Sequence, residues 1–171
     1  NLLNKKNPAN YYLQLLLQHF DDYQLFTDTT AIYPQDIGIS YAALGLVGEL
    51  GEFAEKLHDI ANEKKSIAIN YDQLKTFNEF KDILEQAAKL GAQAEKLKKE
   101  LRNGSRTMPP VIVKNNDQRE GLVLELGDLQ HYVAREARHL LVDLSTVAYE
   151  NVGKIGSRKS RGVIEGNGDY R

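Results

Sequence analysis

The 171-residue sequence contains no cysteine. A disulfide framework and a thiolate metal site are therefore excluded, and the composition is compatible with a reducing compartment. A dominant charge of one sign is also missing, because 22 basic residues nearly balance 24 acidic ones and leave a formal net charge of −2. Such a surface has no general attraction for nucleic acid or for an anionic membrane. We expect a cytoplasmic protein that binds neither, and whose partners are recognised locally.

Long hydrophobic runs and two common catalytic motifs are missing as well. The apolar-rich segment 11–20 is too short to span a bilayer, is interrupted by Gln14 and Gln18, and lacks a signal-peptide cleavage pattern. The absence of a Gly-x-x-x-x-Gly-Lys-Ser/Thr loop argues against a P-loop ATPase or kinase. Without a Ser-His-Asp arrangement, acyl transfer is not expected either.

What remains is an ordinary globular composition with helical patterning. Hydrophobic residues make up 42% of the chain and charged residues 27%, which are values typical of a folded domain. A chain of 171 residues has the length of one domain and can bury a real core. We predict an all-α fold, with residues 1–171 forming a single domain.

Two acidic residues accompany the strongest helical pattern, in the stretch 44–57. Apolar residues recur there at steps of three and four, the spacing of one buried helix face. They are Ala43, Val47, Leu50, Ala54, Leu57 and Ala61. Glu49 and Glu52 lie beside this stripe, and residues three apart on a helix project about 60° apart, so both carboxylates can reach one point.

A second predicted helix has the same combination of an acid pair and an apolar stripe. Glu125 and Asp128 are again three residues apart, within an apolar stripe at helical spacing. This second stripe consists of Leu122, Leu126, Leu129, Val133, Ala137 and Leu140. Four carboxylates gathered at a helix interface would repel one another and lose hydration, so they need compensating positive charge. Mg²⁺ supplies it best, because it takes oxygen ligands and leaves positions for phosphate.

An ordinary explanation competes with this one. Acids three apart are common on the solvated faces of amphipathic helices, and for either pair alone that explanation is the simpler. Glycines next to both pairs in an apolar setting, at Gly48, Gly51 and Gly127, favour a special site.

The order of these motifs resembles a known family. Gly-Leu-Val-Gly-Glu-Leu-Gly-Glu (45–52) is followed by Glu-Leu-Gly-Asp-Leu-Gln-His-Tyr (125–132), by a basic segment at 151–162 and by the ending 166–171. This arrangement is similar to the MazG-like all-α nucleoside triphosphate pyrophosphohydrolases, which include dimeric dUTPases and dCTP pyrophosphatases. The resemblance covers roughly residues 23–59 and 120–171. It implies a four-helix-bundle-like core and cleavage of a nucleoside triphosphate to the monophosphate and pyrophosphate.

The resemblance also implies roles for particular residues. Glu49, Glu52, Glu125 and Asp128 would hold Mg²⁺, with Mn²⁺ as a substitute, and Glu49 or Glu52 would take a proton from water. Contacts to phosphate and sugar would come from Asn151, Lys154, Arg158 and Arg161. Lys56 could touch a phosphate, although pairing with Glu52 is the simpler interpretation. Many relatives have Glu where this chain has Gly48, which leaves the metal count open.

Residues 63–118 depart from the family, whose two acid helices are usually joined by a shorter connection. Within this insertion, a heptad-like stripe predicts one long helix over 75–102, ended by Asn103-Gly104. The stripe comprises Phe80, Ile83, Ala87, Leu90, Ala94, Leu97 and Leu101. Such a helix either packs on its own domain or forms an oligomerisation arm. We expect a homodimer or higher homo-oligomer, since pocket walls that are shared between subunits are common among relatives.

Further helices are expected at about 9–26, from Ser40 to about 62, from a cap at Asn116-Asp117, and from Asp143 or Ser145 to about 157. His131 and His139 are eight residues apart and are interpreted as ordinary exposed or satisfied histidines. The alternative to an enzyme is a catalytically silent helical dimer that binds nucleotide as a sensor or scaffold.

Overall fold

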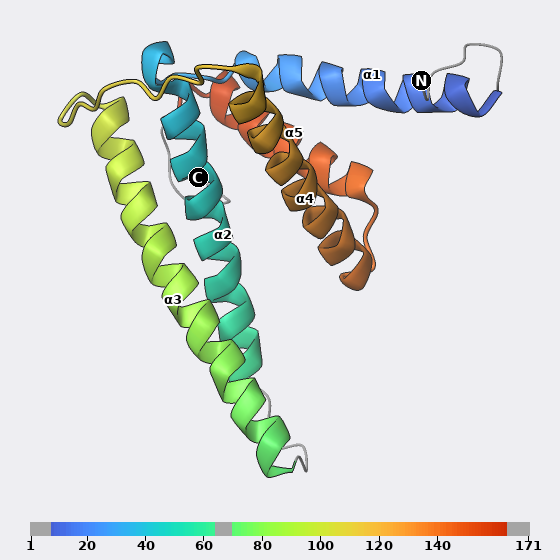
Figure 1. Ribbon diagram of the computed structural model, residues 1–171, viewed down its shortest axis with the longest axis vertical. Helices are drawn as coiled ribbons and strands as arrows, with labels where there is room; N and C mark the ends of the chain where they lie inside the picture. The colour runs from blue at the N-terminus through green and yellow to red at the C-terminus, as the bar shows by residue number, and fades with distance from the viewer. Residues whose placement is uncertain (1–7, 64–69, 164–171) are drawn as a thin grey trace. The chain divides into compact units, whose positions relative to one another are not determined.

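The computed structural model describes residues 8–63 and 70–163, and within these ranges every regular element is a helix (Figure 1). The prediction of an all-α fold is therefore confirmed, while the four-helix-bundle-like core stays a prediction. The elements are α1 (Pro8–Asp28), the 3₁₀ turn η1 (Gln35–Ile37), α2 (Gly38–Glu63), α3 (Tyr71–Arg102), α4 (Asn116–His139) and α5 (Leu144–Ser160).

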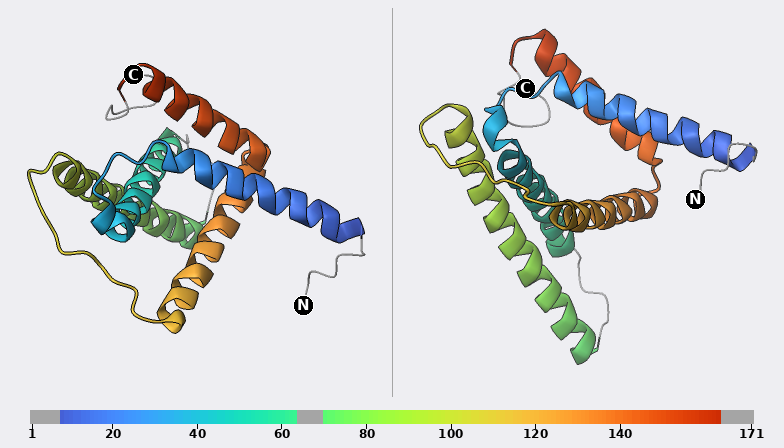
Figure 2. Two further views of the ribbon diagram at one scale, coloured as in Figure 1. Left: turned by 90° about the horizontal axis from the view of Figure 1, so that it is seen from above. Right: turned by 45° about the horizontal axis from the view of Figure 1, so that its top comes forward.

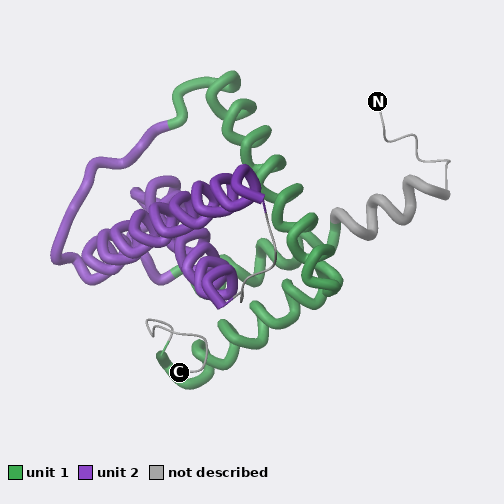
Figure 3. Tube along the Cα trace, turned by 90° about the horizontal axis from the view of Figure 1, so that it is seen from below, with its two compact units in different colours: residues 1–31, 113–171 green, residues 32–112 purple. Residues whose placement is uncertain are grey.

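The chain divides into two compact units, shown in different colours in Figure 3. The continuous unit, Ile32–Ile112, contains η1, α2 and α3. The other unit joins Asn1–Ala31 to Val113–Arg171 and contains α1, α4 and α5. The predicted insertion at 63–118 is thus folded together with the first acid-bearing helix. A single domain over 1–171 stays a prediction.

Helices α2 and α3 form an antiparallel hairpin (Figures 1 and 2). Two glycines, Gly51 and Gly91, meet where the helices cross. A Cβ atom added to Gly51 would lie 2.5 Å from Cα of Gly91 and 3.0 Å from the carbonyl oxygen of Ala87. Backbones this close leave no room for any side chain at the crossing. The long helix therefore packs against α2 of its own chain, and a role as an oligomerisation arm stays a prediction.

The close crossing fixes which faces of the two helices are buried. On α2 the buried residues are Tyr41, Gly48, Gly51, Ala54 and Ala61; on α3 they are Leu84, Gly91, Ala94 and Leu101. Ala54, Ala61, Ala94 and Leu101 were predicted correctly. Val47 and Leu50 on α2, and Ile83 and Leu90 on α3, were not, since they are 43–64% exposed. The physical reason is that glycine permits a closer approach than the neighbouring large side chains.

The two sides of this seam differ in character. One side has a polar hollow of about 320 Å³, lined by Glu55, His58, Asp59, Glu85, Ala88, Lys89 and Ala92. Helical geometry places Val47, Leu50, Ile83 and Leu90 along the opposite side. The hairpin therefore has one apolar side that α2 and α3 do not cover themselves.

Several helix ends differ from the prediction by a few residues. Ser40 is not the N-cap of α2, because η1 leads directly into the helix at Gly38. Stacking of Tyr33 on Tyr41, with ring centroids 4.2 Å apart, fixes this turn around Pro34. The start of α3 was missed: Asn70 and Gln73 form a reciprocal capping box.

The remaining boundaries follow ordinary capping chemistry. Helix α3 ends as predicted, with Asn103 as C-cap and Gly104 at φ 74°. The N-cap of α4 is Asn115, one residue before the predicted position, and its side chain accepts a hydrogen bond from the Gln118 amide. Between α4 and α5, Leu141 adopts φ 59°, a left-handed conformation usually given to glycine.

The unit containing α4 has little core of its own. Among its described residues, Ala137 alone is a buried hydrophobic residue. The predicted stripe of α4 is otherwise exposed at Leu122, Leu126, Leu129, Val133 and Leu140, by 45–61%. Amphipathic helices derive most of their stability from packing of the apolar face, so this stripe needs a covering surface.

The glycine crossing generates a stability prediction. Gly51→Ala should lower the free energy of unfolding by about 2–4 kcal/mol, because its methyl group meets backbone that can move only if the helices separate. Gly45→Ala is the matched control in the same helix, where an added Cβ meets nothing within 4 Å. It should raise stability by up to about 1 kcal/mol through helix propensity. Denaturant titration followed by circular dichroism measures both; equal effects would contradict the crossing.

Candidate functional site

The first acid pair lies on α2 as the sequence predicts. Glu49 and Glu52 are both exposed, three residues apart on the part of the helix that does not contact α3. Lys56 follows one turn after Glu52 and is also exposed. The structure therefore presents two carboxylates and an ammonium group along one strip of α2, with open access from solvent.

The glycines around this pair have a packing role. Gly48 and Gly51 were interpreted as a sign of a special acid site, but both are buried against α3. The space beside Gly48 is filled by the carboxylate of Glu95, which forms an ion pair with Lys98 on the same helix. The glycine spacing is thus explained by the hairpin, and it no longer counts in favour of metal binding.

Sequence reasoning missed Glu95. Its side chain is 16% exposed and that of Lys98 is 14% exposed, which is unusual for charged residues. The available signal was its position four residues after Gly91, on the same face of the helix. Glu95 places a carboxylate of α3 beside Gly48 of α2.

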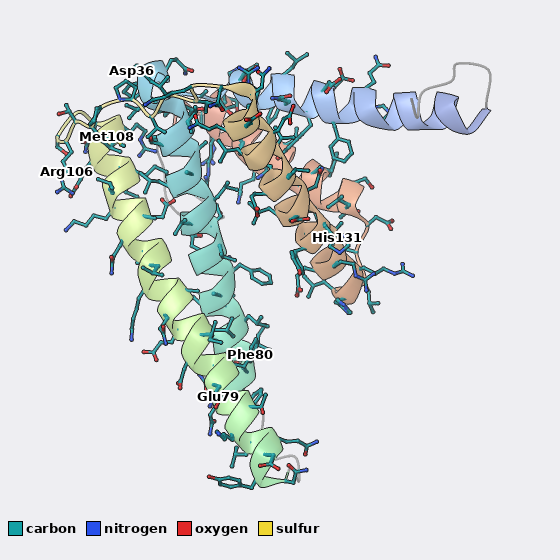
Figure 4. The ribbon with its side chains drawn as sticks, viewed as in Figure 1. Asp36, Glu79, Phe80, Arg106, Met108 and His131 are labelled. Atoms are coloured by element: carbon teal, nitrogen blue, oxygen red, sulfur yellow. The ribbon has the colours of Figure 1, made fainter. Side chains whose placement is uncertain are left out.

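The second acid pair lies on α4. Glu125 and Asp128 are exposed, and a Cβ atom added to the intervening Gly127 would meet nothing within 4 Å. His131, labelled in Figure 4, is exposed and packs edge-on against Tyr132, with centroids 5.6 Å apart. Its interpretation as an ordinary surface histidine agrees with this environment.

The polar residues of α5 fall into two environments. Asn151, Lys154 and Arg158 lie on the half-buried side of the helix, whereas Lys159 and Arg161 are exposed. Half-buried basic side chains are uncommon, so Lys154 and Arg158 are distinguished from ordinary solvated charges. Gly162, at φ 69°, ends α5 in a left-handed conformation. The ending 166–171, which is part of the family resemblance, lies outside the described residues.

One side-chain contact joins α5 to the first helix. The hydroxyl of Tyr23 on α1 donates a hydrogen bond to Oδ1 of Asn151, with an oxygen–oxygen distance of 2.9 Å. Burial raises the pKa of the Tyr23 phenol above its ordinary value. Residues 128 apart in the sequence are thus held together by a partly buried polar contact.

The acid pairs are distributed one to each unit, Glu49 and Glu52 in Ile32–Ile112 and Glu125 and Asp128 in the other. Among residues 8–63 and 70–163, no group of three acidic or histidine side chains could hold a metal ion. Sharing of one ion by the two pairs therefore stays a prediction.

The polar hollow beside the seam is lined in part by His58 and Asp59. His58 lies 3.9 Å from Asp59 and hydrogen-bonds to Asn62. A hydrogen bond from Lys89 lowers the pKa of Glu85, with the positive charge of Lys89 adding to the effect. Because both partners are largely exposed, this ion pair contributes little to stability.

These observations define a class: an all-helical protein with two exposed i, i+3 acid pairs and a half-buried polar strip on its last helix. The chain is 35% identical over 159 residues to the Gene 37 protein of Mycobacterium phage L5, a match that covers 90% of this chain and 99% of that protein. It belongs to the same family as that phage protein. No protein-family model matches the chain, and no solved structure matches it.

The length of this match bears on the segment 63–118. The tenth of the chain that the match leaves uncovered is too short to contain this segment. Most of the segment 63–118 therefore belongs to the family shared with the phage protein.

Proposed function

We propose that this protein is a Mg²⁺-dependent nucleoside triphosphate pyrophosphohydrolase. It would cleave a nucleoside or deoxynucleoside triphosphate between the α and β phosphates and so act in nucleotide metabolism. The observation that supports the proposal is a combination of two features: α2 and α4 each carry an exposed i, i+3 acid pair, and α5 carries Asn151, Lys154 and Arg158 on its half-buried side. It requires that the two pairs meet at a shared ion, within one chain or between two copies.

The donor atoms fit the proposed metal. Glu49, Glu52, Glu125 and Asp128 would offer carboxylate oxygens, the ligand type that Mg²⁺ and Mn²⁺ prefer. When bound, Mg²⁺ would polarise the α-phosphate oxygens and neutralise part of the triphosphate charge. No fixed group of ligands is needed in advance, because exposed carboxylates can reorient around a metal–nucleotide complex.

The remaining steps fall to side chains of this chain. Asn151, Lys154, Arg158 and Arg161 would bind the sugar and the β and γ phosphates, and Lys56 would add a phosphate contact. Glu49 or Glu52 would accept a proton from the attacking water. The water oxygen forms a bond to the α-phosphorus, the bond from that phosphorus to the bridging oxygen breaks, and pyrophosphate leaves.

A homodimer or higher homo-oligomer is part of this proposal. Support comes from the apolar side of the hairpin and from the stripe on α4, which the helices of their own units leave exposed. Exposed apolar rows of this extent are typical of association surfaces. A second copy of the chain would cover these rows and contribute additional residues that line the nucleotide site.

Membrane insertion does not form part of the proposal. The stretch Gln35–Glu63 is the one described segment long and apolar enough to cross a bilayer, with a hydropathy of 1.2. It carries Glu49 and Glu52 near its middle, and each acid would cost roughly 2.5–3.5 kcal/mol in the hydrocarbon. The same length and composition also occur in core helices of water-soluble bundles.

The direct test is a substrate panel. Purified protein is incubated with canonical and modified nucleoside triphosphates and Mg²⁺, and products are separated by anion-exchange chromatography. We expect a nucleoside monophosphate and pyrophosphate from at least one substrate. Glu49→Gln and Asp128→Asn should each reduce turnover by at least about a hundredfold, the scale of losing one transition-state contact of this kind.

A matched control keeps this test specific. Glu120→Gln removes an exposed acid of α4 that does not belong to the acid pair, and it should leave turnover unchanged. Release of orthophosphate would indicate a different hydrolase. No product from any substrate would favour a nucleotide-binding sensor or scaffold.

Convergence of the acids also predicts a stability effect. Glu49→Gln or Asp128→Asn should keep or raise the melting temperature without Mg²⁺, because like charges no longer crowd together. Mg²⁺ should raise the melting temperature of the native protein more than that of either variant. Scanning calorimetry with and without EDTA measures the difference. An identical response to Mg²⁺ in all three proteins would mean that the acids are separate, solvated side chains.

Association is tested on the apolar side of the hairpin. Light scattering should give at least twice the chain mass of 19.3 kDa. The double variant Leu50→Gln and Leu90→Gln should shift the protein toward monomer, because two large apolar contacts on this side are lost. Ile112→Gln, at a position 68% exposed in the connection after α3, is the control and should not change the mass. A monomeric native protein at all concentrations would refute the proposal of self-association.

A further inference from the structure

We infer that Tyr23 is a positioning residue that fixes the side-chain amide of Asn151 so that its two N–H groups face the ligand. The site would therefore take a hydrogen-bond acceptor oxygen at this point, from a phosphate, a sugar hydroxyl or a base carbonyl. This inference rests on the proposed function for the identity of the ligand as a nucleotide. Its physical basis is the contact between α1 and α5, two helices that can be followed by colour in Figure 2.

The geometry of the contact determines which end of the amide is occupied. Oδ1 of Asn151 accepts the hydroxyl proton of Tyr23 at 2.9 Å. An asparagine amide has one oxygen acceptor and one nitrogen with two donors. With Oδ1 engaged by the Tyr23 hydroxyl, Asn151 offers its two N–H donors toward a ligand. In a reversed amide the nitrogen would donate to the Tyr23 oxygen and Oδ1 would be left for the ligand, so the direction of this bond decides which group the ligand meets.

The surroundings make this orientation effective. Tyr23 and Asn151 are both half-buried, so the hydrogen bond is shielded from competition with water. Asn151 precedes Lys154 and Arg158 on the same half-buried side of α5. An amide that donates, followed by two cations, forms a continuous strip of hydrogen-bond donors. Such a strip suits the oxygen-rich edge of a nucleotide.

The first measurement tests the contact without any enzyme assay. Tyrosine labelled with ¹³C at Cζ is titrated by NMR at alkaline pH, and Tyr23→Phe identifies the Tyr23 signal. Burial raises the pKa of the Tyr23 phenol, and donation to Asn151 should add to this effect because it stabilises the protonated phenol. Asn151→Ala should lower the Tyr23 midpoint toward its ordinary value. An unchanged midpoint would overturn the inference.

The second measurement tests the positioning role. Binding of a triphosphate analogue with an imido group between the α and β phosphates is measured by calorimetry, and KM and kcat are measured for any substrate found. Tyr23→Phe should weaken analogue binding and raise KM by roughly three- to tenfold with little change in kcat, as expected for loss of one hydrogen bond. Asn151→Asp, which keeps the shape but removes the donors, should weaken binding further.

Controls separate this inference from the proposed activity. Tyr149→Phe alters an exposed tyrosine on α5, 76% exposed, and should match the native protein in every measurement. If the native protein cleaves a triphosphate and Tyr23→Phe is unchanged in KM and affinity, the inference fails while the activity stands. If the analogue binds, Tyr23→Phe binds more weakly and nothing is cleaved, the inference stands while the activity fails. A native protein that does not bind the analogue would overturn both.

Discussion

The close contact between Gly51 and Gly91 determines much of the hairpin. Helices usually pack with axes 8–10 Å apart, and the spacing depends on the side chains at the contact. With glycine on both sides, the backbones approach closely enough that an added Cβ would meet Cα at 2.5 Å. Small neighbours such as Ala54 and Ala94 then complete the seam. Dispersion contacts between backbones replace the interdigitated large side chains of an ordinary core.

A seam of small residues has a consequence for the large ones. Leu50 and Leu90 flank the crossing and stay more than half exposed, although each belongs to a strong apolar pattern. Helix α2 is thus apolar on more of its circumference than α3 can cover. A helix with two apolar directions is typical of an inner position in a larger bundle. Glu49 and Glu52 lie on the remaining part of α2, which is exposed to solvent.

Close helix packing also decides which features of the fold could be predicted from the sequence. Helix type and approximate ends could be predicted, because periodicity, Asn103-Gly104 and Pro34 act locally. The buried register could not: hydrophobicity favoured Leu90, whereas close approach favoured its neighbour Gly91. Ser40 was misjudged because stacking of Tyr33 on Tyr41, a contact across several residues, sets the helix start. The acids were placed on their helices correctly, but local pattern carries no information on whether two helices bring them together.

The packing role of Gly48 and Gly51 reduces the number of residues that support the family resemblance. A motif such as Gly-Glu-Leu-Gly-Glu combines two signals, and here the glycines are accounted for by α3 packing. Only the acids and the strip on α5 remain to indicate chemistry. That strip is the more informative part, because half-burial of Asn151, Lys154 and Arg158 is not required by helix amphipathicity, whereas exposed glutamates on α2 are. The bond from Tyr23 to Asn151 adds a constraint that a solvated surface would not need. The case for a nucleotide ligand is therefore stronger at α5 than at the acid pairs, although the acids first suggested it.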